Sequence, residues 1–229
     1  MSFRFPDVGE SVIMAGNTRS GKTQLAKYFS QTWGRYFQNL IIDQLDRDRP
    51  RNSDSGTVKT WADYSDGVIP WKEATSSIML QALRQFRIVT IDSHNCGDFK
   101  TMREIWGRIC GVALSRGNTL VICDEIARVC DTNFIHPNHF LLITGRGDKR
   151  RCSAIQATQT PQSCHPKIRD NASHHFYFRL DERICRKYLA SFMDHSEDVL
   201  TLPPYHSLHK YIGPAGKTIY EILKPCPLV

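Results

Sequence analysis

The chain has 229 residues, of which 41% are hydrophobic and 23% are charged, and this is ample for the core of one globular domain of the α/β type. The formal net charge of +7 is compatible with a polyanionic partner such as nucleic acid, although many soluble proteins share it. Residues 1–10 contain no apolar signal core, and no apolar run approaches the roughly 18 residues of a membrane span, so we expect no transmembrane segment.

The eight cysteines are scattered and form no C-x-x-C pair, so we expect reduced thiols in a cytosolic setting. Two groups of Cys and His could be interpreted as metal clusters, namely Cys130, His136 and His139, and His174, His175 and Cys185. Neither group has the spacing of a recognised zinc site, and packing in helices or loops accounts for them equally well.

The first motif joins a strand to a helix. An apolar run at 11–15 predicts a buried strand, and 24–33 is helix-like. Between them lies the pattern GxxxxGK[ST] of a phosphate-binding loop, made up of Gly16, Asn17, Thr18, Arg19, Ser20, Gly21, Lys22 and Thr23. The backbone N–H groups of such a loop and of the following helix start bind anions, so we expect the loop to hold a nucleotide. Lys22 is expected to reach the β- and γ-phosphates, and Thr23 to ligate Mg²⁺.

Strands and helices alternate over the rest of the chain. Apolar runs predict strands at 39–43, 87–92, 119–125, 153–158 and 175–180. Helices are predicted at 71–86, 99–114, 137–144 and 182–192, the first with Ile78, Leu80, Leu83 and Phe86 facing inward and the second ended by Gly117. Residues 46–56 are expected to form a polar surface loop, and Gly-Arg-Gly at 145–147 is expected to cut the third of these helices.

This alternation implies right-handed crossovers and a mainly parallel central sheet flanked by helices, as in the P-loop NTPase fold. We expect a single domain over residues 1–229, with a core at about 11–192 and an extended tail at 193–229 that supplies one or two edge strands. The residues that could take part in binding or catalysis directly follow the apolar runs, at the carboxyl ends of the predicted strands. Open α/β sheets bind their ligands at this edge. These residues are Gly16, Asp43, Asp92, Asp124 and Gln159.

Asp124 and Glu125 follow the apolar residues 120–123 and end the most strand-like segment of the chain, 119–125. Several apolar residues followed by Asp-Glu form the Walker B pattern, in which the first carboxylate is aimed at Mg²⁺, usually through water. Glu125 would then polarise the water that attacks the γ-phosphate. The Asp-Glu pair therefore favours hydrolysis over transfer to a small acceptor.

Three further residues are candidates for roles in the reaction. Gln159 follows the next strand, in Thr-Gln-Thr-Pro at 158–161, where its amide would orient water near the γ-phosphate. Arg146 lies between two glycines and suits charge stabilisation across a subunit interface, because hydrolysis gains greatly from an arginine supplied in trans. Arg169 is a second candidate for that role. The basic segment 146–151 could instead be a surface turn or could contact phosphate backbones.

The order GxxxxGKT, apolar strand with Asp-Glu, Gly-Arg, and strand ending in Thr-Gln-x-Pro resembles the FtsK–HerA division of P-loop ATPases. The compact size is similar to the genome-packaging ATPases of tectivirus-like, membrane-containing icosahedral viruses, and the filamentous-phage assembly ATPases similar to zonula occludens toxin share the order. The expected lack of a transmembrane segment weighs against those toxin-like proteins and the membrane-anchored pumps. Asn17, Thr18 and Arg19 depart from the family pattern, in which small residues or Pro are more usual.

The resemblance spans roughly 11–180 and implies roles for three residues. Gln159 would assist γ-phosphate sensing, Arg146 would act across a ring, and Arg169 would belong to the subunit interface. It also implies an ATPase that uses ATP and Mg²⁺ to move double-stranded DNA into a preformed viral capsid. Its partners would be DNA, further copies of this chain in a hexameric or pentameric ring, and proteins of the capsid vertex, in the host cytoplasm or the virion.

Two alternatives stay open at the level of sequence. One is a nucleoside or small-molecule kinase, which would use the basic segment 146–151 as a lid. The other is a nucleotide-binding adaptor in virion assembly with little turnover. No residue is seen to read the base, so ATP in preference to GTP rests on the resemblance alone.

Overall fold

The computed structural model describes residues 4–45, 51–53, 56–58, 60–180, 183–213 and 215–227. Within these residues the main sheet has nine strands in the order β11-β10-β9-β1-β8-β7-β2-β6-β5. All neighbours from β9 to β5 pair in parallel, and β10 and β11 complete one side as antiparallel strands. The strands are β1 (Ser11–Ala15), β2 (Asn39–Gln44), β5 (Gly67–Pro70), β6 (Ile88–Asp92), β7 (Thr119–Cys123), β8 (Ser153–Thr158), β9 (His174–Phe178), β10 (Ser207–Ile212) and β11 (Thr218–Leu223). The predicted mainly parallel sheet and the C-terminal edge strands are confirmed.

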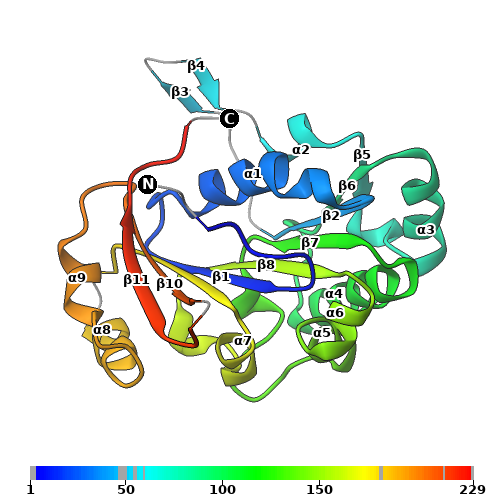
Figure 1. Ribbon diagram of the computed structural model, residues 1–229. Helices are drawn as coiled ribbons and strands as arrows, with labels where there is room; N and C mark the ends of the chain where they lie inside the picture. Colours follow the sequence, from blue (N-terminus) through cyan, green and yellow to red (C-terminus); the bar gives the residue numbers. More distant parts are fainter. Residues whose placement is uncertain are drawn as a thin grey trace.

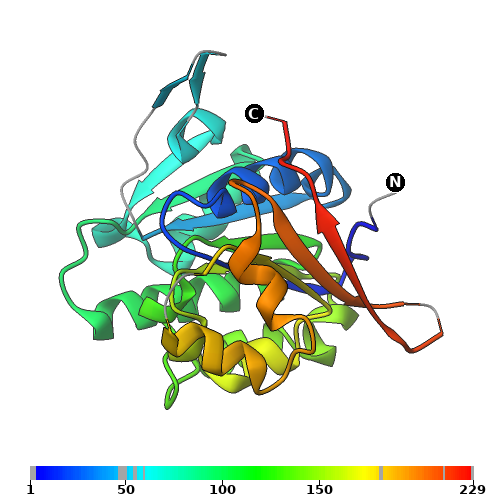
Figure 2. The same ribbon diagram turned by 90° about the vertical axis from the view of Figure 1, so that its left-hand side faces the viewer.

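Helices cover both faces of this sheet (Figure 1). One face is covered by α1 and α2, and the other by α3, α4, α5 and α7. Over β9 and β10 that second face is covered by α8 and α9 (Figure 2). The helices are α1 (Lys22–Thr32), α2 (Trp61–Tyr64), α3 (Ser76–Gln85), α4 (Phe99–Arg116), α5 (Pro137–Leu142), α6 (Gly145–Lys149), α7 (Pro166–Asp170), α8 (Arg183–Ala190) and α9 (Ser196–Thr201).

The central strands are apolar along their whole length because both of their faces are covered. In β1, Val12 and Met14 pack with Phe29 of α1, whereas Ile13 between them joins the core on the opposite face. Successive side chains of a strand point to opposite faces, so one short run supplies both cores. This double burial fixes the ends of the strands, and therefore the loops that follow them, against a rigid support.

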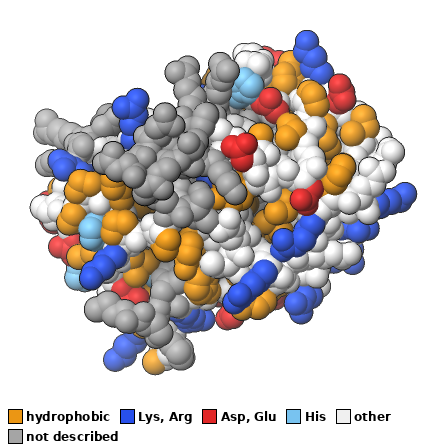
Figure 3. Space-filling view, turned by 90° about the horizontal axis from the view of Figure 1, so that it is seen from above, with side chains coloured by type: hydrophobic (Ala, Val, Ile, Leu, Met, Phe, Trp, Pro, Cys, Tyr) orange, Lys and Arg blue, Asp and Glu red, His pale blue; other side chains and the backbone are white. Residues whose placement is uncertain are grey.

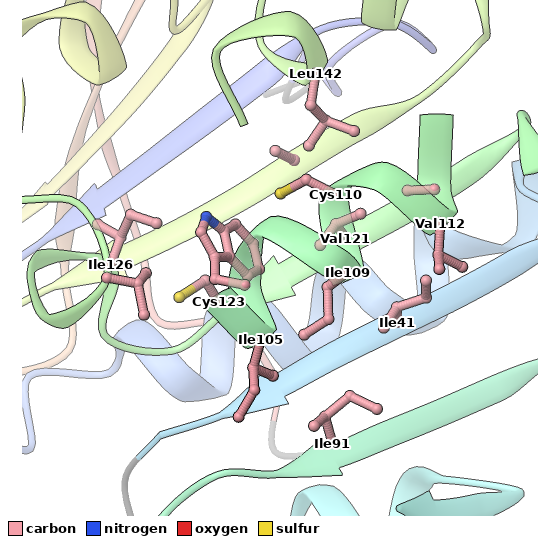
Figure 4. Close-up of a cluster of buried hydrophobic side chains, with 14 of the residues drawn as sticks. Ile41, Ile91, Ile105, Ile109, Cys110, Val112, Val121, Cys123, Ile126 and Leu142 are labelled. Carbon is pink, nitrogen blue, oxygen red and sulfur yellow. The ribbon is translucent and has the colours of Figure 1, made fainter. Parts of the chain in front are cut away.

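The longest helix packs its apolar stripe against the middle of the sheet (Figure 4). Ile105, Ile109 and Val112 of α4 belong to the same buried cluster as Ile41 of β2 and Val121 of β7. The spacing of three and four residues places these side chains on one face of the helix. Gly117, with φ of 72°, ends α4 as predicted.

The inward face predicted for the helix at 71–86 was right for Leu83, which is buried, and for Leu80, which packs against the core, but wrong for Ile78 and Phe86. A 3-10 turn at Trp71–Glu73 precedes α3, and Met79 and Leu83 are the buried residues of that helix. Ile78 and Phe86, which we expected inside, are each 38% exposed. The reason is positional, because α3 lies at the side of the molecule next to edge strand β5 and has only a narrow stripe to cover (Figure 1).

The helix predicted at 137–144 ends at Leu142, before the glycines around Arg146, as expected, but these glycines lie in a further short helix, α6, that was not predicted. Gly147 is required there because a Cβ would come within 1.7 Å of the Leu142 carbonyl oxygen. Gly145 has open space where its Cβ would be. Arg146 is therefore an exposed residue on a helix and not a residue of a loose loop.

Three other segments differ from the expectation. Residues Arg51–Ser53 and Gly56–Val58 pair as the hairpin β3–β4, in the region expected to be a surface loop, while the rest of 46–55 lies outside the described residues. Strand β5 was not predicted, and the tail expected to be extended contains α9 before its strands. Among the described helices, none has the length and apolar character needed to span a membrane.

Candidate active site

The loop between β1 and α1 is held by the ends of the neighbouring strands. Gly16 N donates to the Thr158 carbonyl at the end of β8 (3.2 Å), and Asn17 N donates to the Arg179 carbonyl after β9 (3.0 Å). Helix α1 starts at Lys22 with no acidic residue in its first turn. The positive end of its dipole therefore faces the loop without a neutralising carboxylate, which favours an anion there.

Two glycines allow the loop its shape. A Cβ on Gly16 would lie 2.5 Å from Phe178 Cβ and 2.8 Å from Ser20 Oγ, so any side chain there would clash with the end of β9 and with the loop itself. Gly21 has φ of 113°, a backbone conformation that L side chains rarely adopt. Ser20 Oγ is buried and has no hydrogen-bond partner among the described residues. An open glycine cradle with an unsatisfied hydroxyl fits a phosphate group.

Lys22 folds back over the same loop. Its ammonium group is buried and donates to the carbonyl oxygens of Gly16 (2.7 Å) and Asn17 (2.8 Å). Thr23 is half-buried in the first turn of α1, while Arg19 is exposed and has a left-handed backbone with φ of 64°. The cation is thus positioned within the loop before any ligand arrives.

The two carboxylates after β7 have different surroundings. Asp124 Oδ1 accepts a hydrogen bond from Leu45 N at the end of β2 (2.8 Å), and Arg128 donates to the Leu45 carbonyl (3.2 Å). Glu125 is only 6% exposed, and its carboxylate accepts from the Thr158 hydroxyl (2.8 Å) and from Gln159 N (3.2 Å). Asp124 is therefore the more accessible of the two, and Glu125 is bound to the end of β8.

Gln159 connects this group to the phosphate loop. The Thr18 hydroxyl donates to Gln159 Oε1 at 2.6 Å, across 141 residues of sequence. The side chain of Gln159 thus contacts the loop while its backbone N–H contacts Glu125. Five residues predicted from separate motifs, Thr18, Lys22, Asp124, Glu125 and Gln159, are all brought to one edge of the sheet, where β1, β7 and β8 end.

Asp43 is a buried acid that the sequence placed at a strand end without a role. It pairs with Cys123 of β7 and Ile91 of β6, and its backbone carbonyl accepts from Asp124 N (3.4 Å). Its side chain is fully buried, and burial raises the pKa of Asp43 to about 7. The sequence signal was an acid directly after Leu-Ile-Ile, inside what proves to be the strand.

The two candidate arginines have their contacts outside the group of residues at this edge. Arg146 is on α6, which leads into the amino end of β8, the opposite end from Gln159. Arg169 of α7 is paired with Asp170 (2.8 Å) and lies over the rings of Tyr188 and Phe192. Burial by itself lowers the pKa of Arg169, but the bond to Asp170 raises it above the usual value. Neither arginine joins the site of its own chain, and their action on a neighbouring subunit stays a prediction.

The donor atoms at this edge suit a small hard cation. Thr23 and Asp124 present oxygen, and Mg²⁺ prefers oxygen ligands and keeps several of its waters. The site thus combines a glycine loop that suits an anion, a buried ammonium group, a partly exposed carboxylate and a buried carboxylate that is bonded to the end of β8. Such a combination can bind a nucleoside triphosphate and activate a water molecule.

No protein-family model matches the chain, and no curated protein is similar to it in sequence. The fold, however, is similar to that of solved structures. The genome packaging NTPase B204 from Sulfolobus turreted icosahedral virus 2, in complex with ATP-gammaS, has a TM-score of 0.72 at 18% identity, covering 97% of this chain and 100% of that one. The DNA-packaging ATPase from Sulfolobus turreted icosahedral virus has a TM-score of 0.70 at 19% identity, covering 96% and 98%.

At this low identity the likeness concerns the fold. The chain has the mixed α/β P-loop NTPase fold of these packaging NTPases over nearly its whole length. The fold class predicted from the motifs is therefore confirmed, as is the structural likeness to packaging ATPases.

Proposed function

We propose that this chain is an ATP-hydrolysing motor that translocates double-stranded DNA, and that it packages a viral genome into a preformed capsid. The observation that carries the proposal is the bond between Glu125 and the end of β8, because it joins the candidate water-activating group to Gln159. Support comes also from the fold, which is shared with enzymes described as genome-packaging NTPases.

Each residue has a role in the proposed reaction. The loop N–H groups and Lys22 bind the phosphates, with Lys22 exchanging its loop carbonyl partners for phosphate oxygens. Glu125 holds the attacking water and takes its proton, and Gln159 contacts the γ-phosphate. Thr18 reports that contact to the loop through its bond to Gln159.

Mg²⁺ would be held by the Thr23 hydroxyl and by Asp124, through water at the latter. When bound with the nucleotide, it would neutralise charge on the phosphate oxygens. The bond from Leu45 N to Asp124 orients the carboxylate in advance, so less conformational entropy is lost on binding.

The motor proposal extends to partners that the single chain does not contain. We propose a homo-oligomeric ring, hexameric or pentameric, in which Arg146 completes a neighbour's site and Arg169 braces the interface. The ring would act at a capsid vertex, in the host cytoplasm or in the virion. The net charge of +7 supports a DNA partner, although on the face seen in Figure 3 the Lys and Arg side chains are dispersed among other types.

The placement of Glu125 favours hydrolysis over the kinase alternative. Transfer to a small acceptor needs the acceptor, and not a water molecule, beside the γ-phosphate, and a buried carboxylate bonded to Gln159 N suits water. No contact in the described residues specifically favours the adaptor alternative.

The proposal is tested by measuring phosphate release with ATP and Mg²⁺, with and without duplex DNA, together with displacement of a third strand from a DNA triplex. DNA-stimulated hydrolysis and strand displacement are expected. Phosphorylation of a nucleoside acceptor would identify a kinase instead. ATP binding without turnover, together with capsid binding that does not depend on DNA, would identify the adaptor.

A further inference from the structure

The nucleotide site described so far accounts for phosphates and metal but leaves the base without a partner. One aromatic side chain stands next to the phosphate loop with most of its surface uncovered. Tyr205 is 55% exposed, and its Cδ1 would lie 3.4 Å from a Cβ placed on Gly21. We propose that the ring of Tyr205 stacks on the base of the bound nucleoside triphosphate. This inference rests on the proposed nucleotide-binding function.

The sheet topology places Tyr205 next to the phosphate loop. Strand β10 runs antiparallel to β9, and its first residue, Ser207, pairs with Phe178 at the carboxyl end of β9. The segment before β10 therefore emerges at the same edge as the phosphate loop, which is itself bonded to the Arg179 carbonyl. Figure 2 shows this turn, in orange, reaching the start of α1, in blue.

The backbone of Tyr205 is in a conformation that its side chain does not favour. His206 N donates to the Pro203 carbonyl (3.1 Å), which closes a four-residue turn with Pro204 second and Tyr205 third. Tyr205 has φ of 62°, and the third position of such a turn is usually glycine. A bulky residue at positive φ is an outlier that costs stability and marks functional sites. A ring is thus kept at a position where glycine would fold better.

The chemistry of an exposed phenol ring beside a phosphate site suits a base. Aromatic rings bind bases through their π-faces, with little dependence on the hydrogen-bonding edge. The phosphate loop fixes one end of the ligand, and stacking then requires only that the ring lie within reach of the other end. The ligand class is a nucleoside triphosphate with a large base, which stacking favours over an inorganic polyphosphate.

The strain at Tyr205 allows one substitution to distinguish a structural role from a ligand-binding role. Loss of a structural residue would lower thermal stability, whereas loss of a ligand-binding residue would lower nucleotide affinity. Tyr205→Gly removes the ring and also relieves the strained backbone. We expect the thermal midpoint to stay unchanged or to rise, while the dissociation constant of a non-hydrolysable ATP analogue increases at least about fivefold. Binding of inorganic tripolyphosphate should stay within about twofold of wild type. Tyr205→Phe, which keeps the ring, should retain analogue affinity.

Tyr36→Ala is the matched control, because Tyr36 is also 55% exposed and lies beyond the far end of α1. It should change neither affinity. Calorimetric titrations of wild type and the three variants decide the matter. Equal changes for the analogue and tripolyphosphate, or no change for either, would overturn the stacking role while leaving the nucleotide site intact. Wild-type protein that binds neither probe would instead contradict the proposed function itself.

Discussion

The hydroxyl of Thr18 donates a 2.6 Å hydrogen bond to the side-chain oxygen of Gln159, and so joins the phosphate loop to the end of β8. The backbone N–H of the same Gln159 donates a hydrogen bond to the Glu125 carboxylate. Through the contact proposed between Gln159 and the γ-phosphate, a change at that phosphate would reach both the loop and the candidate base. The bond also explains why a threonine is useful in a loop position where smaller residues are more usual.

The Thr18–Gln159 bond predicts coupled effects on hydrolysis. Thr18→Val and Gln159→Ala should each lower kcat/KM for ATP, and the double variant should be little worse than Gln159→Ala alone, because both changes break the same bond. Steady-state phosphate release measures the four proteins of this cycle. Effects that simply add would show that the two side chains act independently.

Glu125→Gln should lower kcat by at least about 100-fold while leaving nucleotide binding within a few-fold of wild type. Glutamine keeps an oxygen to accept from Thr158, so the fold is retained, but it cannot take a proton from water. Phosphate release and analogue titration give the two numbers. Glu104→Gln, with a half-exposed side chain on α4, is the control and should be unaffected. Normal hydrolysis by Glu125→Gln would remove this residue as the base.

Arg146 is predicted to act on the nucleotide site of a neighbouring subunit. This is tested by mixing two variants that are each inactive. Arg146→Ala subunits and Lys22→Ala subunits should each be inactive alone. A mixture should recover part of the activity, because some sites combine an intact loop with a neighbour's intact arginine. Hydrolysis across a series of mixing ratios provides the measurement. The position of α6 at the amino end of β8 makes failure of recovery at every ratio informative, since it would assign Arg146 to the surface.

Substitution of the two glycines that flank Arg146 by alanine is predicted to have opposite effects on stability. Gly147→Ala should destabilise the fold by about 2 kcal/mol or more, since its Cβ would lie 1.7 Å from the Leu142 carbonyl oxygen. Gly145→Ala, with nothing near the new methyl, should be neutral or stabilise by up to about 1 kcal/mol. Urea unfolding of both variants distinguishes them, and equal stabilities would contradict the packing of α6.

We predict that the burial of His139 makes the free energy of unfolding fall in acid. It is fully buried, with Nε2 bonded to Gln156 Oε1 (2.7 Å) and Nδ1 next to Cys130 Sγ (3.0 Å), and burial lowers its pKa to about 3. Its ordinary value is about 6.5, so the unfolded chain binds a proton that the native protein does not. The stabilising contribution of neutral His139 to the free energy of unfolding is therefore complete above pH 6.5. It falls by about 1.4 kcal/mol for each pH unit as the pH drops towards 3.

Denaturant unfolding at several pH values checks this sign. His139→Gln, although less stable at neutral pH, should lose less stability than wild type on acidification from 6.5. His195→Gln, at a side chain that is 49% exposed, is the control for the effect of the substitution itself. Parallel curves for wild type and His139→Gln would show that the buried imidazole does not titrate in this way.

The sequence by itself determined the strand–loop–helix at 11–32, the Asp124–Glu125 strand and the parallel sheet, because these depend on local patterns. Apolar runs, glycines at fixed offsets and an acid after a buried strand act over a few residues, and such signals survive in any context. Strands β1 and β8 were accordingly predicted with the bounds that the structure has, and β7 ends two residues before the predicted segment does.

Only the tertiary structure decided which of those residues touch. The Thr18–Gln159 and Thr158–Glu125 bonds join residues 141 and 33 positions apart, and strand order alone brings them together. The exposure of Ile78 and Phe86 on α3 was likewise decided by the tertiary structure, since periodicity cannot say how much surface a helix has to cover. The place of Tyr205 beside Gly21 likewise follows from antiparallel β10, a pairing between distant segments that no local pattern encodes.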